Sequence, residues 1–231
     1  MLLFSLECSA AAASAAIYRD EKLLGEEFLN VPQTHSVTLL PMAKSLLEHT
    51  GISPAQIDYY AVSRGPGSFT GLRIGIAAIK GLAFPDDTPC IGVSTPEAIA
   101  YGLLGFEGTV IPMMDARCGQ VYTALFQGKD GRLTRLSEDE ALPLSELKEK
   151  LKSCTGPLWL CGDGAHLGLA AWGGELPVRM APAHLCCQRA SAVGLAAMQH
   201  LGEAVSPAAL VPCYLRPANA MTLAERQKKA E

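Results

Sequence analysis

The chain has 231 residues, of which 49% are apolar and 18% are charged, and its formal net charge is −4. This composition provides a sizeable hydrophobic core and excludes a disordered chain. The acidic balance excludes a protein that grips nucleic acid alone through a broad basic face, and the compact basic cluster at Arg226, Lys228 and Lys229 is interpreted as a solvated helix end. Apolar runs stay shorter than the roughly 18 residues of a membrane span. The scattered cysteines, without a C-x-x-C pair, predict reduced thiols in a cytoplasmic protein.

Strands and helices alternate through the first half of the sequence. Between residues 39 and 47, leucine and alanine recur on one side of a helix, which we expect Gly51 to end. Pro85 ends the next helix. We expect strands at residues 2–7, 14–18, 22–31, 59–63 and 89–93, and helices at 36–49, 72–84 and 95–102.

The second half repeats the beginning of this pattern, with a hairpin turn signal at Lys129-Asp130-Gly131. We expect strands at residues 109–115, 120–126, 132–137, 158–161 and 178–181, and helices at 144–152 and 189–202. Two consecutive units of three strands, helix, strand and helix predict an α/β protein with two ribonuclease-H-like lobes, the architecture of the actin-like ATPase (ASKHA) superfamily. The lobes are expected at residues 1–105 and 106–231.

The segment between the strand at 59–63 and the helix at 72–84 carries the most information. It reads Gly65-Pro66-Gly67-Ser68-Phe69-Thr70-Gly71. Glycines permit positive φ and close approach of another backbone, and Ser68 or Thr70 can cap the helix. The segment matches neither a P-loop nor the dinucleotide motif. Two interpretations stay open: a tight turn that packs the helix on its strand, or a contact with a ligand or partner.

This signature loop closely resembles that of the TsaB (YeaZ) family, bacterial proteins of the tRNA threonylcarbamoyladenosine pathway that are related to TsaD/Kae1. Two further segments are similar to the family: Asp115-Ala116-Arg117 with Val121-Tyr122, and Pro212-Cys213-Tyr214-Leu215-Arg216. The resemblance implies a non-catalytic scaffold that activates TsaD, together with the ATPase TsaE, in threonylcarbamoylation of adenosine 37 of ANN-decoding tRNAs. ATP and Mg²⁺ would serve the complex, with no cofactor assigned to this chain, and tRNA would be held mainly by a partner.

A nucleotide site in this superfamily needs a carboxylate and a glycine-containing phosphate turn near the N-terminus. Glu7 stands where TsaB-like proteins usually have aspartate, and residues 8–14 contain no glycine. We expect Glu7 to hydrogen-bond the turn, the alternative being a water-bound cation. Gly162-Asp163-Gly164 is either a vestigial nucleotide contact or a simple helix entry. Nucleotide binding by these residues would make the chain a weak actin-like ATPase or phosphotransferase.

Metal chemistry has little support in the sequence. TsaD-like proteins bind metal through an H-x-x-x-H pair, whereas here Leu39 stands where His35 would need its second ligand. We therefore expect no metal site, which makes a glycoprotease-like peptidase the weakest alternative. Cys118, beside Arg117, is an outside candidate for a reactive thiol.

The expected partner surface is the face of the two long helices in the first half. Small residues let helices approach closely, and apolar residues supply contact area. The resemblance implies that this face serves both a homodimer and the TsaD heterodimer, the alternative being that the same residues are ordinary core. The predicted interface consists of Leu39, Leu40, Ala43, Leu47, Arg73, Ile74, Ala77 and Ala78.

Overall fold

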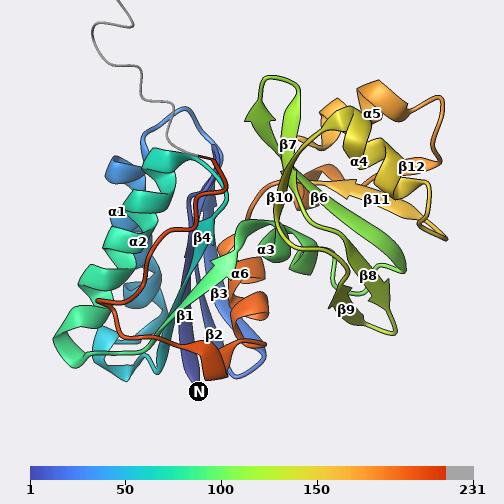
Figure 1. The fold of residues 1–231 in the computed structure, drawn as a ribbon. Helices are drawn as coiled ribbons and strands as arrows, with labels where there is room; N and C mark the ends of the chain where they lie inside the picture. Colours follow the sequence, from blue (N-terminus) through green and yellow to red (C-terminus); the bar gives the residue numbers. More distant parts are fainter. Residues whose placement is uncertain (217–231) are drawn as a thin grey trace, which may run out of the picture.

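Two β-sheets lie side by side in the computed structural model of the protein, which describes residues 1–216 (Figure 1). The α/β class predicted from the sequence is confirmed. The basic cluster at Arg226, Lys228 and Lys229 lies outside the described residues. Within residues 1–216, none of the helices is both long and apolar enough to cross a membrane.

The first sheet has five strands in the order β3-β2-β1-β4-β5. Its first three strands form an antiparallel meander, while β4 runs parallel to β1 and β5 runs parallel to β4. The apolar sequence of β1 suits its central position, because residues 3–7 are all buried. The strands are β1 (Leu2–Glu7), β2 (Ala13–Arg19), β3 (Lys22–Leu29), β4 (Tyr59–Gly65) and β5 (Cys90–Ser94).

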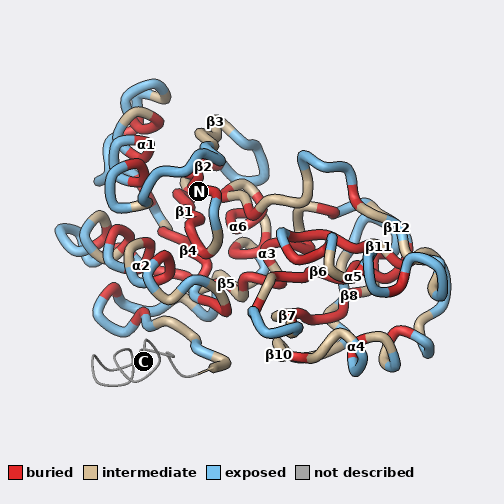
Figure 2. The backbone as a smooth tube through the Cα atoms, turned by 90° about the horizontal axis from the view of Figure 1, so that it is seen from above, coloured by how far each residue is buried: buried red, intermediate tan, exposed pale blue. Residues whose placement is uncertain are grey.

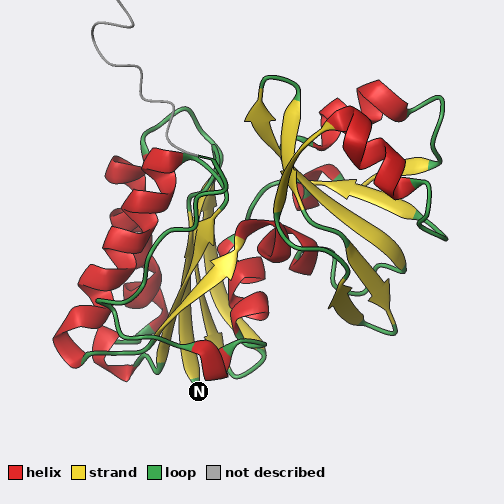
Figure 3. Cartoon of the chain, in the orientation of Figure 1, coloured by secondary structure: helices red, strands yellow, loops and turns green. Residues whose placement is uncertain are grey.

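Two long helices, α1 (His35–Thr50) and α2 (Phe69–Ala83), cover one face of this sheet (Figure 3). They bury Leu39, Leu46 and Ile79 against the strands. Gly51 ends α1 with a φ of 64°, as predicted. Every element expected in the first half forms, with ends displaced by at most three residues, because the apolar periodicity and the capping residues agree there.

The opposite face is covered by α3 (Thr95–Tyr101) and by α6 (Ala190–Ala197), which comes from the far end of the chain. Two buried hydrogen bonds hold α6 in place. The Ser5 hydroxyl donates to the carbonyl oxygen of Ala190 at 2.7 Å, and the Ala190 amide donates to Ser14 Oγ at 2.7 Å. The interpretation that this helix completes the second unit is wrong, because its small side chains instead fill the core beside Tyr18.

Within the described residues the second sheet has seven strands, in the order β10-β7-β6-β11-β12, with β8 pairing with β6 and β9. The single strand expected at 120–126 divides into β7 and β8, which pair with different parts of β6. The strand β10 has four residues and no alternating pattern, and it was not predicted. The strands are β6 (Gly108–Arg117), β7 (Gln120–Thr123), β8 (Phe126–Lys129), β9 (Arg132–Arg135), β10 (Glu140–Pro143), β11 (Leu158–Cys161) and β12 (Val178–Met180).

Helices α4 (Leu144–Leu151) and α5 (Ala165–Trp172) cover one face of the second sheet. Their apolar sides pack on Ile111 and Leu160 of its central strands. Short 3-10 turns lie at Pro54–Gln56, Phe84–Asp86, Ala183–Leu185 and Leu201–Glu203.

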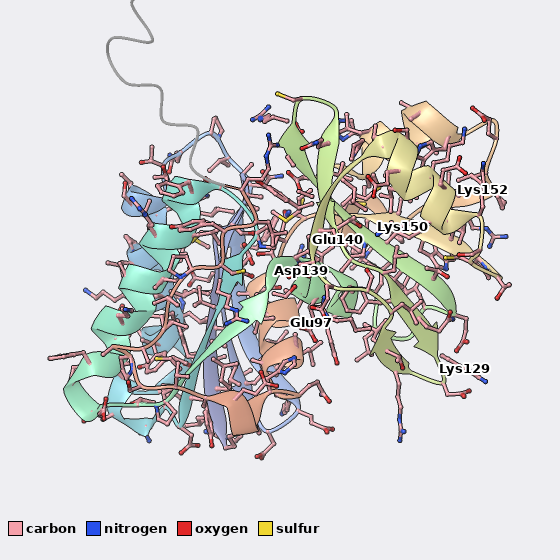
Figure 4. All side chains as sticks on the ribbon, viewed as in Figure 1. Glu97, Lys129, Asp139, Glu140, Lys150 and Lys152 are labelled. Carbon is pink, nitrogen blue, oxygen red and sulfur yellow. The ribbon has the colours of Figure 1, made fainter. Side chains whose placement is uncertain are left out.

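An ionic cluster joins the second sheet to the helices of the first. Arg135 of β9 lies 3.2 Å from Glu97 of α3 and 2.8 Å from Asp139. His200 contacts the other Glu97 oxygen at 3.0 Å. Figure 4 shows Glu97 and Asp139 close together where the two halves meet. The two sheets are therefore connected by ion pairs as well as by the chain.

Candidate functional site

The glycines of the signature loop, Gly65–Gly71, are required by contacts within the chain itself. Gly65 has a φ of 124°, and a Cβ there would collide with the carbonyl oxygen of Cys213. A Cβ on Gly71 would collide with the carbonyl oxygen of Cys8. Pro66 follows a cis peptide bond. The structural interpretation therefore accounts for these glycines, because the loop holds two other segments of backbone against it.

Ser68 connects the loop to the turn between β1 and β2. Its amide donates to the carbonyl oxygen of Ser9 at 2.7 Å, and a Cβ on Gly67 would lie 2.7 Å from the same oxygen. Ser68 Oγ accepts the amide of Gly71 at 3.2 Å and so caps α2. The other candidate cap, Thr70, is exposed and lies within the helix.

Glu7 is fully buried at the end of β1. Its carboxylate accepts hydrogen bonds from the Ser9 amide and from the Ser63 hydroxyl. Burial raises the pKa of Glu7, because surroundings of low polarity disfavour its charged form. The expectation that this carboxylate hydrogen-bonds the turn agrees with these contacts.

A cleft of about 450 Å³ lies between the two sheets, next to this turn. Its residues do not fit a magnesium nucleotide, because Glu7 is occupied by the turn and the described lining holds no glycine-containing phosphate cradle. The lining consists of Ser9, Ala10, Ala11, Gly67, Ser68, Met114, Asp115, Ala116, Arg117, Tyr122 and Asp163.

The proposed vestigial nucleotide contacts separate into two kinds. Gly162 and Gly164 pack against β6, since a Cβ on the first would collide with the Met113 carbonyl oxygen and a Cβ on the second would lie 2.8 Å from the Asp115 amide nitrogen. Asp163 alone of the three residues lines the cleft, and its carboxylate accepts a 2.8 Å hydrogen bond from Gln188. Helix entry accounts for both glycines.

The predicted interface residues lie on two sides of their helices. Leu39 and Ala43 are 0% and 1% exposed, and Leu47 and Ala78 are each 8% exposed, so these four belong to the core of the first sheet. These side chains pack against the strands because the apolar stripe of each helix faces the sheet, so their part in an interface stays a prediction. The outer side carries Leu40, Arg73 and Ala77, which are exposed, and Ile74, which is half-buried. Figure 2 shows the buried inner sides and the exposed outer sides of both helices.

An apolar groove of about 960 Å³ runs along this outer side. Leu40, which is 51% exposed, forms one wall, and the edges of Ala43 and Leu47 belong to the lining. Sequence reasoning missed this groove because it depends on the Gly51–Pro54 turn, which contributes four of the lining residues. The full lining is Leu40, Pro41, Ala43, Lys44, Leu47, Glu48, Gly51, Ile52, Ser53, Pro54 and Leu82.

A third, smaller cavity of about 210 Å³ lies where the signature loop, the β6–β7 turn and residues 213–216 meet. We call it the arginine pocket, because Arg117 and Arg216 belong to its lining. The predicted pair of Asp115 and Arg117 forms, with 3.5 Å between the charged groups and a 2.7 Å hydrogen bond from the Arg117 amide. The sequence analysis singled out the Asp115-Ala116-Arg117 segment and the Pro212–Arg216 segment, but it could not show that the two lie together in the fold.

Comparison with known proteins identifies the family of this chain. A family model described as tRNA N6-adenosine threonylcarbamoyltransferase, TsaD, matches residues 29–154. The protein of Bacillus subtilis named tRNA threonylcarbamoyladenosine biosynthesis protein TsaB is 34% identical over 72% of this chain and 73% of its own length. The chain belongs to the TsaB family. The TsaB of Escherichia coli is also 34% identical, over 71% of this chain and 72% of its own length.

Solved structures of TsaB-like proteins share the whole fold. YeaZ from Pseudomonas aeruginosa superposes with a TM-score of 0.77 at 27% identity, covering 93% of this chain and 99% of that one. A protein described as similar to peptidase YeaZ, from the same organism, gives a TM-score of 0.80 at 28% identity over the same shares. The two-sheet architecture is thus common to the TsaB-family structures compared.

The two remaining candidates for chemistry in this TsaB-family chain are His35 and Cys118. His35 Nε2 lies 2.7 Å from the carbonyl oxygen of Ala10, and in the part of the chain that the structure describes no three potential ligands gather around a metal position. Cys118 is exposed at the β6–β7 turn, beside Arg117. Within residues 1–216, neither residue has a contact that defines a catalytic pair.

Proposed function

We propose that this TsaB-family chain is the non-catalytic partner of TsaD in the threonylcarbamoylation of adenosine 37 of ANN-decoding tRNAs. It holds TsaD in a competent arrangement, TsaE supplies ATP hydrolysis to the complex, and tRNA is bound mainly through TsaD. In the absence of TsaD, the same surface forms a homodimer. The proposal treats the two sheets as two actin-like lobes, with the division at residues 105 and 106 remaining a prediction.

The observation that carries this proposal is the uncovered apolar side of α1 and α2. Leu40 is 51% exposed and Val37 is 65% exposed, beside a groove of about 960 Å³. Exposed apolar patches of this kind mark protein interaction sites in monomeric folds. The Glu7 carboxylate accepts hydrogen bonds from within the chain, so it is not available to hold a nucleotide-bound cation. This supports a non-catalytic role.

The interface is accordingly assigned to the outer residues Leu40, Arg73, Ile74 and Ala77. Ala77 is the most informative position, because it is exposed in the middle of α2 and has no long side chain of its own. An arginine there adds bulk and charge to the face without entering the core. The neighbouring Ala78 is buried and cannot serve this purpose.

The test is size-exclusion chromatography with light scattering, on the protein alone and mixed with TsaD from its own organism. We expect a homodimer that converts to a heterodimer, and we expect Ala77→Arg to weaken both. Ala170→Arg is the matched control, because Ala170 is exposed in α5 on the second sheet. Unchanged association of Ala77→Arg would exclude this interface, and magnesium-dependent ATP hydrolysis by the pure chain would exclude the non-catalytic role.

A further inference from the structure

The arginine pocket lies apart from the apolar groove and has a different chemistry. Among residues 1–216, its lining contains two arginines and no acidic residue. It comprises Pro66, Gly67, Phe69, Ala116, Arg117, Cys118, Tyr122, Cys213, Tyr214, Leu215 and Arg216. A chain with a net charge of −4 thus carries a small cavity whose described lining is positively charged.

The guanidinium groups of this pocket have spare hydrogen-bonding capacity. Arg216 donates from one terminal nitrogen to the carbonyl oxygen of Ala116 at 2.9 Å. Arg117 is 86% exposed and its one carboxylate contact, with Asp115, is 3.5 Å long. A guanidinium has five N–H donors in a planar fork, so each keeps donors free for an anion.

An aromatic ladder forms the adjoining wall. The rings of Phe69 and Tyr214 stack with centroids 4.7 Å apart, and the Arg73 guanidinium lies 3.9 Å from the Phe69 centroid. Arg73 also donates to the Tyr214 hydroxyl at 3.2 Å. Tyr214 is 38% exposed, so part of this wall is open to a further flat group. These contacts hold the Arg73 guanidinium against the two aromatic rings.

We propose that the arginine pocket binds one nucleotide unit, with its phosphate on Arg117 and Arg216 and its base against the exposed part of Tyr214. Arginine forks recognise phosphate oxygens, and aromatic side chains stack on any base. The same chemistry is offered by a free nucleotide and by one nucleotide of an RNA strand. The inference goes beyond the proposed function, because it concerns a direct contact of this chain and a surface other than the α1–α2 groove.

The geometry favours a nucleotide over an acidic peptide. A peptide is recognised through a groove with pockets for alternate side chains, whereas this cavity is about 210 Å³ and combines a cationic side with an aromatic side. It shares the lining residues Gly67, Ala116, Arg117 and Tyr122 with the larger cleft, whose lining also holds the carboxylates of Asp115 and Asp163, so the phosphate is placed on the arginine side.

Two measurements test the pocket on the full chain. Fluorescence anisotropy with a labelled single-stranded RNA of mixed sequence covers the strand, and calorimetry with AMP covers the free nucleotide. We expect Arg117→Gln to weaken binding and to reduce the salt dependence of RNA binding by about 0.7 in the log–log slope. Tyr214→Leu should weaken binding about tenfold, while Tyr214→Phe keeps the ring and most of the affinity.

Arg132→Gln is the matched control, because Arg132 is an exposed arginine on β9, away from the pocket. Thermal unfolding of each variant separates loss of binding from loss of fold. Selective weakening of RNA binding supports a strand as the ligand, and selective weakening of AMP binding supports a free nucleotide. Equal effects of Arg117→Gln and Arg132→Gln overturn the proposal, as does binding of a polyglutamate peptide in place of both nucleotide probes. Intact TsaD association in Arg117→Gln keeps this test separate from that of the groove.

Discussion

The helix pairs on the two sheets differ in the chemistry of their outer sides. On the first sheet, α1, α2 and the turn that follows α2 expose Val37, Leu40 and Phe84, which are 65%, 51% and 78% exposed. On the second sheet, α4 and its surroundings are covered by lysine–glutamate pairs: Lys148–Glu175, Lys150–Glu140 and Lys152–Glu149. Figure 4 shows Glu140, Lys150 and Lys152 on this half of the molecule.

This difference in charge on the outer sides shows how a solvated helix face can be distinguished from a candidate interaction surface. Both helix pairs bury apolar stripes against a sheet, so the inner sides look alike in the sequence. The outer sides are informative, because interface cores are depleted in charge whereas solvated faces carry it. By this criterion, the outer side of the first pair is the better candidate for a partner surface, in agreement with the proposed function.

The largest expected effect is on stability, and it distinguishes the buried side of α2 from its exposed outer side. Ala78→Arg places a charge among buried side chains and should lose at least ~4 kcal/mol of the free energy of unfolding. Ala77→Arg, one residue away and exposed, should unfold at nearly the wild-type temperature. Thermal unfolding of the two variants measures this contrast. A stable Ala78→Arg protein would show that the packing of α2 described here is incorrect.

The second expectation compares a buried carboxylate with a surface pair. Glu7→Ala should lose about 3 kcal/mol, because the Ser9 amide and Ser63 hydroxyl lose their buried acceptor. Lys150→Ala, which breaks a partly exposed pair, should lose ~0.5 kcal/mol. Urea unfolding of both variants gives the comparison. Similar losses would contradict the assignment of Glu7 as a buried structural acceptor.

The same residue predicts a pH dependence. Burial raises the folded-state pKa of Glu7 above its ordinary value. Its contribution to stability is therefore fully present below the unfolded-state pKa and is lost as the pH rises through the folded-state pKa. Glu7→Gln, which resembles the neutral acid, should remove this loss. A pH series of urea unfolding on wild type and Glu7→Gln checks the sign.

The third expectation exchanges the chemistry of the two faces. Leu40→Lys gives the first face a charge like those of the second, and should weaken association with TsaD or with itself about tenfold. Leu169→Lys is the matched control, because Leu169 is 40% exposed on α5. Analytical ultracentrifugation over a concentration series measures both. Equal weakening by the two variants would remove the distinction between the faces.

The smallest expected effect concerns His200, which contacts Glu97 of the ionic cluster from the segment after α6. Burial opposes charge on His200, but hydrogen bonds to Glu97 and Glu203 outweigh it and raise the pKa of His200. Its contribution is therefore present below the unfolded-state pKa and is lost as the pH rises through the folded-state pKa. His200→Gln should flatten this dependence by under ~1 kcal/mol. Thermal unfolding across the neutral range measures it, and an unchanged profile would contradict the role of this cluster.

The first half of the fold follows from local signals in the sequence. Gly51 ends α1 where periodicity predicted, and the central strand β1 has the predicted residues. The fate of α6 could not be predicted in the same way. Its residues are small and apolar on nearly every side, so the pattern does not tell which sheet it covers. Long-range hydrogen bonds to Ser5 and Ser14 hold α6 on the first sheet.

The candidate sites show the same limit. The family resemblance directed the predicted interface to α1 and α2, but periodicity could not assign Leu39 to the core and Leu40 to the surface before the position of the sheet was known. The arginine pocket is assembled from segments about fifty and a hundred residues apart in the chain, around Phe69, Arg117 and Tyr214. The sequence motifs marked each segment, and only the fold brings them together.

The position of α6 has a consequence for synthesis on the ribosome. The first sheet is complete in strands by residue 94, yet one face gains its α6 cover only when residues 190–197 have emerged. During that interval, Tyr18, Ala61 and Val93 lack their final neighbours. The nascent N-terminal half is therefore expected to need shielding until translation is nearly finished.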